Sequence, residues 1–339
     1  MNDIDRAKQK LLRELSRENE IKRVRKYFYA FYVATAIVAT CFFVWFISQL
    51  TFDYTVSGRN VTITHYKGTE TEVEIPSRIL WFNVTAIGEM AFFGREDITT
   101  VIIPYGVTYI GRFAFTGNTG LTYVSIPASV RYIGEGAFRS CTSLTHVYIP
   151  YGVEVIGRHA FRESGLTSVN IPDSVTEIGS FAFSNIASLT NVSLSRNITT
   201  IHMGTFSQAI NLTSITIPYG VTLIGMYAFE GNINLTCVTI PNSVTAIDIG
   251  AFRHCKSLTS ITIPASVMLI EIFVFNGNSS LESAYFEGNA PTLALPLPRN
   301  GQQLENPAFF GTPPYFTIFY RYGTYGWTNP WFTIPTVAR

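Results

Sequence analysis

A 23-residue repeat is the feature that most limits what this chain can fold into. The unit is L-T-x-V-x-I-P-x-x-V-x-x-I-G-x-x-A-F followed by five variable residues. The residue before the proline position recurs at intervals of 23 residues, with one of 22, at Ile103, Ile126, Ile149, Ile171, Leu194, Ile217, Ile240, Ile263 and Phe286. The aromatic anchor keeps the same spacing at Phe92, Phe115, Phe138, Phe161, Phe183, Phe206, Phe229, Phe252 and Phe275.

One unit cannot be stable alone. It carries about seven apolar anchors, whose burial contributes about 10–20 kcal/mol. Ordering its backbone costs at least about 23 kcal/mol, at roughly 1 kcal/mol per residue. Units must therefore stack, so that each covers the apolar face of its neighbour.

Residue types predict the path of each unit. L-T-x-V-x-I alternates and is rich in β-branched residues, so it predicts a short strand that the following proline ends. V-x-x-I, for example Val221–Ile224, predicts a second short strand or extended arm. The glycine after it is expected to allow a turn with positive φ. The A-F step is expected to open a single helical turn, with Phe as the large core residue, and equivalent strands to stack in parallel about 4.8 Å apart.

One unit departs from the pattern. Leu194-Ser195 replaces Ile-Pro, and Thr205 replaces the usual alanine before Phe206. Both changes remove a shared feature of the stack, so the weakest stacking is expected in this unit.

The pattern resembles the BspA-like class of leucine-rich repeats over residues 98–286. Residues 51–97, with Val61–Gly68 and Val73-Glu74-Ile75-Pro76, look like the entry cap of that class, and residues 287–339, with Thr317–Tyr320 and Gly323–Trp327, like its exit cap. We therefore expect a mainly β fold: a right-handed leucine-rich repeat solenoid with short parallel strands, plus one N-terminal transmembrane helix. The commonest leucine-rich repeat has asparagine where this one has proline, so no asparagine ladder is expected. The resemblance implies surface-exposed binding or adhesion modules of host-associated bacteria and some protists, without catalytic residues.

Residues 27–49 are predicted to be a transmembrane signal-anchor helix. Tyr27–Ser48 is uncharged and, as a helix, spans about 33 Å against about 30 Å of hydrocarbon. Residues 1–26 hold nine Lys/Arg and five Asp/Glu, a net charge of +4, and the next basic residue after the stretch is Arg59. The positive-inside rule then places residues 1–26 in the cytoplasm as a basic segment and residues 51–339 outside it.

Three alternatives to the signal anchor fit these residues less well. A cleaved signal peptide has an apolar stretch of about 7–15 residues that ends at small residues, whereas this stretch is longer and ends in Phe46–Leu50. A lipoprotein signal at Cys41 has an ill-fitting Thr40 before the cysteine. A buried core helix would not need the basic flank. The sequence favours the anchor over each.

Nothing in the sequence predicts catalysis. No two of the five histidines have the spacing of metal ligands, and there is no G-x-S-x-G, phosphate loop or H-E-x-x-H. Cys141 and Cys255 share one position of the repeat five coils apart, too far for a disulfide. The chain's net charge of +1 gives no reason to expect nucleic acid. We expect a protein without enzymatic activity, cofactor or metal.

The outward side of the first strand in each unit is the candidate ligand-binding face. It is hydroxyl-rich and almost without charge, and Tyr123, His146 and Tyr148 bring aromatic rings onto adjacent units. The simpler explanation, which we favour, is that Thr and Tyr are good strand residues. The functional interpretation is a platform for glycans or peptides. Its candidate residues are Tyr123, His146, Tyr148, Asn170 and Asn191, with Tyr105 and Tyr151 at its rim.

The function expected from these features is a cell-surface or extracytoplasmic binding or adhesion protein, with a protein or glycan ligand on the strand face and a membrane contact through residues 27–49. The alternative is a periplasmic or envelope scaffold that organises partner proteins without host contact. An accessory domain of a degradative enzyme is disfavoured, since no catalytic segment accompanies the repeats.

Overall fold

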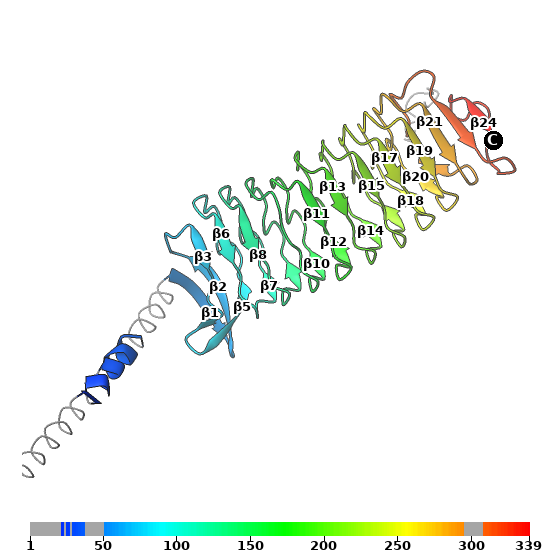
Figure 1. Ribbon diagram of the computed structural model, residues 1–339. Helices are drawn as coiled ribbons and strands as arrows, with labels where there is room; N and C mark the ends of the chain where they lie inside the picture. The colour runs from blue at the N-terminus through cyan, green and yellow to red at the C-terminus, as the bar shows by residue number, and fades with distance from the viewer. Residues whose placement is uncertain (1–21, 24, 28, 38–50, 295–307) are drawn as a thin grey trace, which may run out of the picture. The chain divides into compact units, whose positions relative to one another are not determined.

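The protein is described by a computed structural model over residues 22–23, 25–27, 29–37, 51–294 and 308–339. Contacts divide the chain into two compact units, Met1–Thr51 and Phe52–Arg339. Figure 1 shows that the second unit is a stack of similar coils whose short strands lie side by side from β1 to β24.

The predicted membrane helix lies largely outside the described residues. Residues 22–23, 25–27 and 29–37 are helical, whereas residues 28 and 38–50 are not described. No helix within the described ranges is long and apolar enough to cross a membrane. The transmembrane helix at 27–49 therefore stays a prediction.

The N-terminal end of the second unit contains antiparallel strands. β1 pairs with β2 in a hairpin, and β4 pairs with β5, while β2 and β5 are parallel. The bounds are β1 (Phe52–Ser57), β2 (Asn60–Tyr66), β4 (Arg78–Ile79) and β5 (Phe82–Ile87).

The first strand of each coil forms the main ladder. Its paired strands run parallel as predicted, and the pairing stops at three points along it. In β15, Ile215 is buried between exposed Ser214 and Thr216, so one face of the strand lines the core and the other forms the surface. The strands are β3 (Glu72–Glu74), β6 (Thr100–Ile102), β8 (Tyr123–Ser125), β11 (Ser168–Asn170), β13 (Asn191–Ser193), β15 (Ser214–Thr216), β17 (Cys237–Thr239), β19 (Ser260–Ile263), β21 (Ser283–Phe286), β23 (Thr317–Tyr320) and β24 (Thr336–Ala338). The outward side of this ladder is called the strand face below.

A second ladder of two-residue strands confirms the predicted extended arm. Val221–Ile224, for example, contains β16, which pairs in parallel with its neighbours on both sides. The strands are β7 (Tyr109–Ile110), β9 (Tyr132–Ile133), β10 (Val155–Ile156), β12 (Glu177–Ile178), β14 (Thr200–Ile201), β16 (Leu223–Ile224), β18 (Ala246–Ile247), β20 (Leu269–Ile270) and β22 (Thr292–Leu293). After the last regular repeat, β22 extends this ladder, and β23 and β24 extend the main one.

The prediction of a helical turn at the A-F step is wrong. The residues two before and two after each anchor have positive φ; around Phe115 these are Phe113 at 53° and Gly117 at 76°. The amides of these three residues all donate to carbonyl groups of the next coil, at 2.7, 2.8 and 2.9 Å. A helix would direct the same N–H groups to its own carbonyls. Hydrogen bonding between coils therefore determines the backbone conformation around each anchor phenylalanine.

The reason given for the glycine of the I-G step is also wrong. Gly111 and Gly157 do not have positive φ. A Cβ on Gly157 would lie 2.7 to 2.9 Å from the backbone of the preceding coil, and one on Gly111 would lie 2.5 Å from Gly88. Glycine is present because successive coils approach each other closely at this point. Three coils carry His202, Asp248 or Glu271 instead, so glycine is not required in every coil.

The predicted aromatic anchors form one continuous column through the core. All nine are fully buried, and each ring stacks on the next at centroid distances between 4.8 and 5.7 Å. The column continues beyond the repeats, since Tyr66 stacks on Phe92 at 5.3 Å and Phe309 on Phe275 at 5.1 Å. The column accounts for the constant position of Phe in the repeat.

Isolated asparagines link coils at a position other than that of the proline. Asn118, Asn232 and Asn278 are fully buried three residues after an anchor Phe. Each accepts a hydrogen bond from the backbone N–H of the residue 23 positions earlier, at 3.2, 2.9 and 2.9 Å. Single asparagines thus join neighbouring coils at this position, but they do not recur in every coil and so form no asparagine ladder.

The coil from Leu194 to Phe206, in which the sequence predicts the weakest stacking, coincides with a break in the second ladder. The second ladder stops at β12 and begins again at β14. The ring of Phe206 lies 5.7 Å from the anchor rings on both sides, among the largest spacings in the column. Ser195 stands in place of proline, and its buried hydroxyl donates to the Val175 carbonyl.

We expect the amide of His202 to exchange with solvent about ten-fold or more faster than the amide of Gly225. The N–H of Gly225 donates to the Ile201 carbonyl at 2.8 Å, whereas His202, one coil earlier, has no such bond to Ile178 because the ladder is interrupted there. Hydrogen exchange of the two peptides, followed by mass spectrometry, tests this. Equal protection of the two amides would contradict the assignment of the weak coil.

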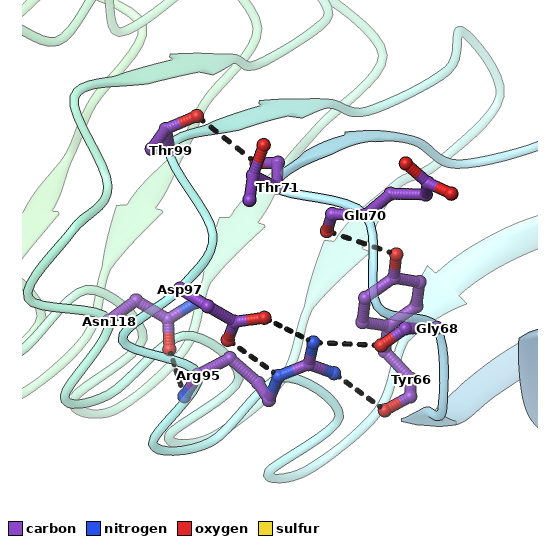
Figure 2. A network of polar contacts seen from close by, with 8 residues as sticks. All are labelled: Tyr66, Gly68, Glu70, Thr71, Arg95, Asp97, Thr99 and Asn118. Carbon is purple, nitrogen blue, oxygen red and sulfur yellow. Dashed lines mark hydrogen bonds and ion pairs between the residues drawn. The ribbon is translucent and has the colours of Figure 1, made fainter.

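An arginine clamp joins the N-terminal hairpin to the first coils (Figure 2). The Arg95 guanidinium donates to both carboxylate oxygens of Asp97 at 2.9 and 2.7 Å, and to the carbonyls of Tyr66 at 3.2 Å and Gly68 at 2.8 Å. It also lies over the Tyr66 ring, 4.8 Å from its centroid. The hydrogen bond between Arg95 and Asp97 raises the pKa of the arginine and lowers that of the carboxyl. These contacts fix the start of the solenoid.

Candidate functional site

The strand face presents small polar side chains along most of its length. From β11 to β19 its strands place their outer residues in solvent, as in β11, where Ser168 and Asn170 are exposed on either side of buried Val169. The outer residues of β13 and β17 are likewise exposed, but their central valines are only half-buried. The face therefore offers hydroxyl and amide groups at regular intervals.

Three of the predicted residues come together around a small pocket. Tyr123, His146 and Tyr148 line a hollow of about 230 Å³ together with Val124, Ser125 and Ile126. Both tyrosines are largely exposed, at 55% and 74% of their surface. Aromatic rings at the edge of a shallow pocket give an apolar contact for a flat ligand.

The His146 ring is oriented by two threonines. Its Nδ1 lies 3.0 Å from the hydroxyl of Thr145, and its Nε2 lies 3.4 Å from the hydroxyl of Thr167 in the next coil. Residues 145–149 form no strand, so the main ladder is interrupted between β8 and β11. This interruption coincides with the single 22-residue spacing, from Ile149 to Ile171.

The other predicted residues are exposed but do not join this pocket. Tyr105 and Tyr151 are 80% and 73% exposed, in turns that follow the main-ladder positions. Asn170 pairs in register with Ser193, and Asn191 with Ser168, so the two asparagines lie at opposite ends of adjacent strands. The structure therefore assembles three of the seven predicted residues into one site.

The turn position of these tyrosines carries an ion pair in the coils that follow. Asp173 accepts hydrogen bonds from the backbone N–H of Arg196 at 2.8 Å and from its guanidinium. These bonds lower the pKa of Asp173. The pair separates Tyr151 from Tyr219, the next tyrosine of this position, so no continuous tyrosine row forms along the rim.

The structure also contains a larger hollow at the C-terminal end of the strand face, which the sequence analysis does not predict. It has a volume of about 860 Å³ and is lined by residues of β19, β21 and β23 and by Arg339. Tyr285 and Phe319 stack within it at 5.1 Å. The only signal for it in the sequence is an aromatic residue at the outward position of both T-I-F-Y and S-A-Y-F.

The described cysteines are not suited to catalysis. Cys141 and Cys255 are free, as their separation in the repeat predicts, and the structure buries both, whereas Cys237 is exposed. Burial raises the pKa of Cys141 to about 12 and also raises that of Cys255, so neither forms a thiolate at neutral pH. In the ranges that the structure covers, no group of three or more His, Cys, Asp or Glu side chains could hold a metal ion. Nothing in the geometry points to catalysis.

Comparison with known proteins agrees with this architecture. The model of the BspA type leucine rich repeat region matches residues 65–187 and 176–295 in six copies. A leucine-rich repeat protein from Bacteroides ovatus is similar in structure, with a TM-score of 0.68, 28% identity, and coverage of 80% of this chain and 70% of that one. No curated protein matches the chain.

Two further solved structures share the fold. The leucine-rich repeat protein TpLRR of T. pallidum has a TM-score of 0.50 and 30% identity, with 61% of this chain and 88% of that chain covered. A leucine-rich repeat protein from Eubacterium ventriosum has a TM-score of 0.52 and 22% identity, with 80% of this chain and 76% of that one covered.

Proposed function

Because the chain belongs to the family of BspA-type leucine-rich repeat proteins, we propose that it is a cell-surface or extracytoplasmic binding or adhesion protein. Its ligand is a protein or a glycan that contacts the strand face. Residues 27–49 anchor the protein in the membrane as a single span, with residues 1–26 in the cytoplasm and residues 51–339 outside it.

The observation that carries the proposal is the character of the strand face. A repeat protein needs an apolar interior, but its outer strand residues are free to serve recognition. Here they are hydroxyl and amide groups, with the aromatic pocket of Tyr123, His146 and Tyr148 among them. Binding then consists of many weak polar contacts spread along the face, with the aromatic rings as the strongest local contact.

Protease treatment of intact source cells tests the location. Peptides from residues 51–339, identified by mass spectrometry, are expected to be released while an internal marker protein stays intact. Protection in intact cells that is lost when the envelope is opened would overturn the surface assignment and favour the periplasmic or envelope scaffold.

The binding role is tested by screening the full-length chain, purified in a mild detergent, against matrix proteins and glycans. A ligand of the strand face is expected to bind Tyr148→Ala more weakly than the unchanged protein. Tyr219→Ala is the matched control, since Tyr219 is 79% exposed but lines none of the described pockets. Equal loss in both variants would contradict the assignment of the pocket.

A further inference from the structure

The 860 Å³ hollow at the C-terminal end of the strand face has the size of a ligand pocket. A neighbouring depression of about 360 Å³ shares Asn242, Thr262 and Glu287 with it, so the hollow continues toward β17. This C-terminal pocket has no lining residue in common with the pocket of Tyr123, His146 and Tyr148.

Its aromatic wall is covered by a guanidinium group. Tyr285 and Phe319 are register partners on β21 and β23, and their rings stack with an interplanar angle of 15°. The guanidinium carbon of Arg339 lies 4.7 Å from the centroid of Phe319 and 5.1 Å from that of Tyr285. An arginine that lies over aromatic rings keeps its N–H donors at its edges, where they can bind a carboxylate with two parallel hydrogen bonds.

The charged groups of the pocket favour an anionic ligand. Arg321, Arg339 and Glu287 all line it, so these three side chains carry a net charge of +1. None of the ion pairs between described residues involves any of the three. Two guanidinium groups are thus available to one carboxylate.

A serine hydroxyl in the same pocket has no hydrogen-bond partner. Ser266 lines the pocket, and its Oγ is buried without a partner in the structure. In three other coils the serine at this position accepts a bond from a glycine N–H of the preceding coil, at 3.1, 3.3 and 3.1 Å. The preceding coil has Ser243 in place of that glycine. Because buried polar atoms are rarely left unpaired, a ligand hydroxyl fits here.

We propose that the C-terminal pocket binds an acidic sugar, whose carboxylate pairs with Arg339 and Arg321. The hydroxyls of the sugar pair with Ser266, Thr262 and Glu287, and its ring lies at the edge of the wall formed by Tyr285 and Phe319, beside the guanidinium that covers it. Several polar groups beside an aromatic wall suit a polyhydroxylated ring better than an acidic peptide side chain. The inference rests on the proposed function in that both place ligands on the strand face.

The test uses calorimetric titration of the full-length chain, purified in a mild detergent. The probe is a tetrasaccharide of alternating glucuronic acid and N-acetylglucosamine, and its carboxyl-reduced form is the neutral counterpart. We expect the acidic probe to bind and the reduced probe to bind about ten-fold or more weakly, because charge-assisted hydrogen bonds are lost. No binding of the acidic probe at about millimolar concentration, or equal binding of the two, would overturn the proposal.

Variants locate the site. Arg339→Gln and Arg321→Gln are each expected to weaken binding of the acidic probe about ten-fold, and Ser266→Ala a few-fold. Arg339→Lys, which keeps the charge but not the planar group, is expected to restore only part of the affinity. Arg158→Gln, at an exposed arginine elsewhere on the solenoid, is the matched control and is expected to leave binding of the acidic probe unchanged.

Two further outcomes separate this inference from the proposed function. A hexaglutamate peptide that binds as tightly as the sugar would overturn the assignment to acidic sugars. The ligand of the pocket would then be an acidic peptide. Failure of the sugar titration together with release of residues 51–339 by protease would reject this inference alone. Protection from protease with intact sugar binding would reject only the surface location.

Discussion

Phe229→Ala is expected to lower the free energy of unfolding by about 3–5 kcal/mol. Phe229 is fully buried, and its ring stacks between Phe206 at 5.7 Å and Phe252 at 5.3 Å. Removing the ring leaves a cavity between three coils, and the hydrogen bonds that join those coils limit how far they can close it. Urea unfolding of the variant and of the unchanged protein measures the loss.

The control is Tyr219→Ala, in the same repeat. Tyr219 is 79% exposed, so its removal is expected to change stability by less than about 0.5 kcal/mol. Because repeat arrays can unfold in parts, hydrogen exchange of the coils around Phe229 complements the urea measurement. A cost below about 1 kcal/mol would mean that Phe229 does not hold the core.

Arg95→Ala is expected to cost about 2–3 kcal/mol, the second largest effect. The substitution removes the hydrogen bonds to Asp97 and to the carbonyls of Tyr66 and Gly68, and leaves those carbonyls without their side-chain donor. The Arg95 side chain is only 21% exposed, so water replaces these bonds poorly. Arg95→Lys keeps the charge but cannot reach all three partners, and is expected to recover less than half of the loss.

Arg196→Ala is the matched control for the clamp. Arg196 also pairs with a carboxylate, Asp173, but its side chain is 83% exposed. Exposed ion pairs contribute little, so the expected cost is below about 1 kcal/mol. Equal costs for Arg95→Ala and Arg196→Ala in urea unfolding would show that the clamp does not hold the N-terminal hairpin.

The clamp also gives a direction for the effect of pH. The hydrogen bond from Arg95 lowers the pKa of Asp97 from its usual 3.8. A carboxyl with a lower pKa in the folded state contributes stability that is present above the unfolded pKa and is lost as the pH falls through the folded value. The difference in stability between the unchanged protein and Arg95→Ala should therefore narrow below about pH 4.

Site residues could be predicted from the sequence only where the regular repeat assigns neighbouring positions. Tyr123 and His146 share one position in successive units, so the period alone places them on neighbouring coils, and the structure brings them together with Tyr148. The C-terminal pocket has no such signal. Tyr285 and Phe319 are register partners, but Phe319 lies beyond the last regular unit, where the period no longer assigns neighbours.

The sequence by itself determined the stack, the parallel strands and the column of anchor phenylalanines. The physical reason is that each unit is too small to bury its own apolar residues. Each coil must therefore be covered by an adjacent coil, and a regular repeat supplies adjacent coils with matching apolar positions. Only the tertiary structure decided the backbone around each anchor, the role of Gly111 and Gly157, and the position of the C-terminal pocket. These depend on hydrogen bonds and close contacts between coils, and such contacts exist only after the coils have stacked.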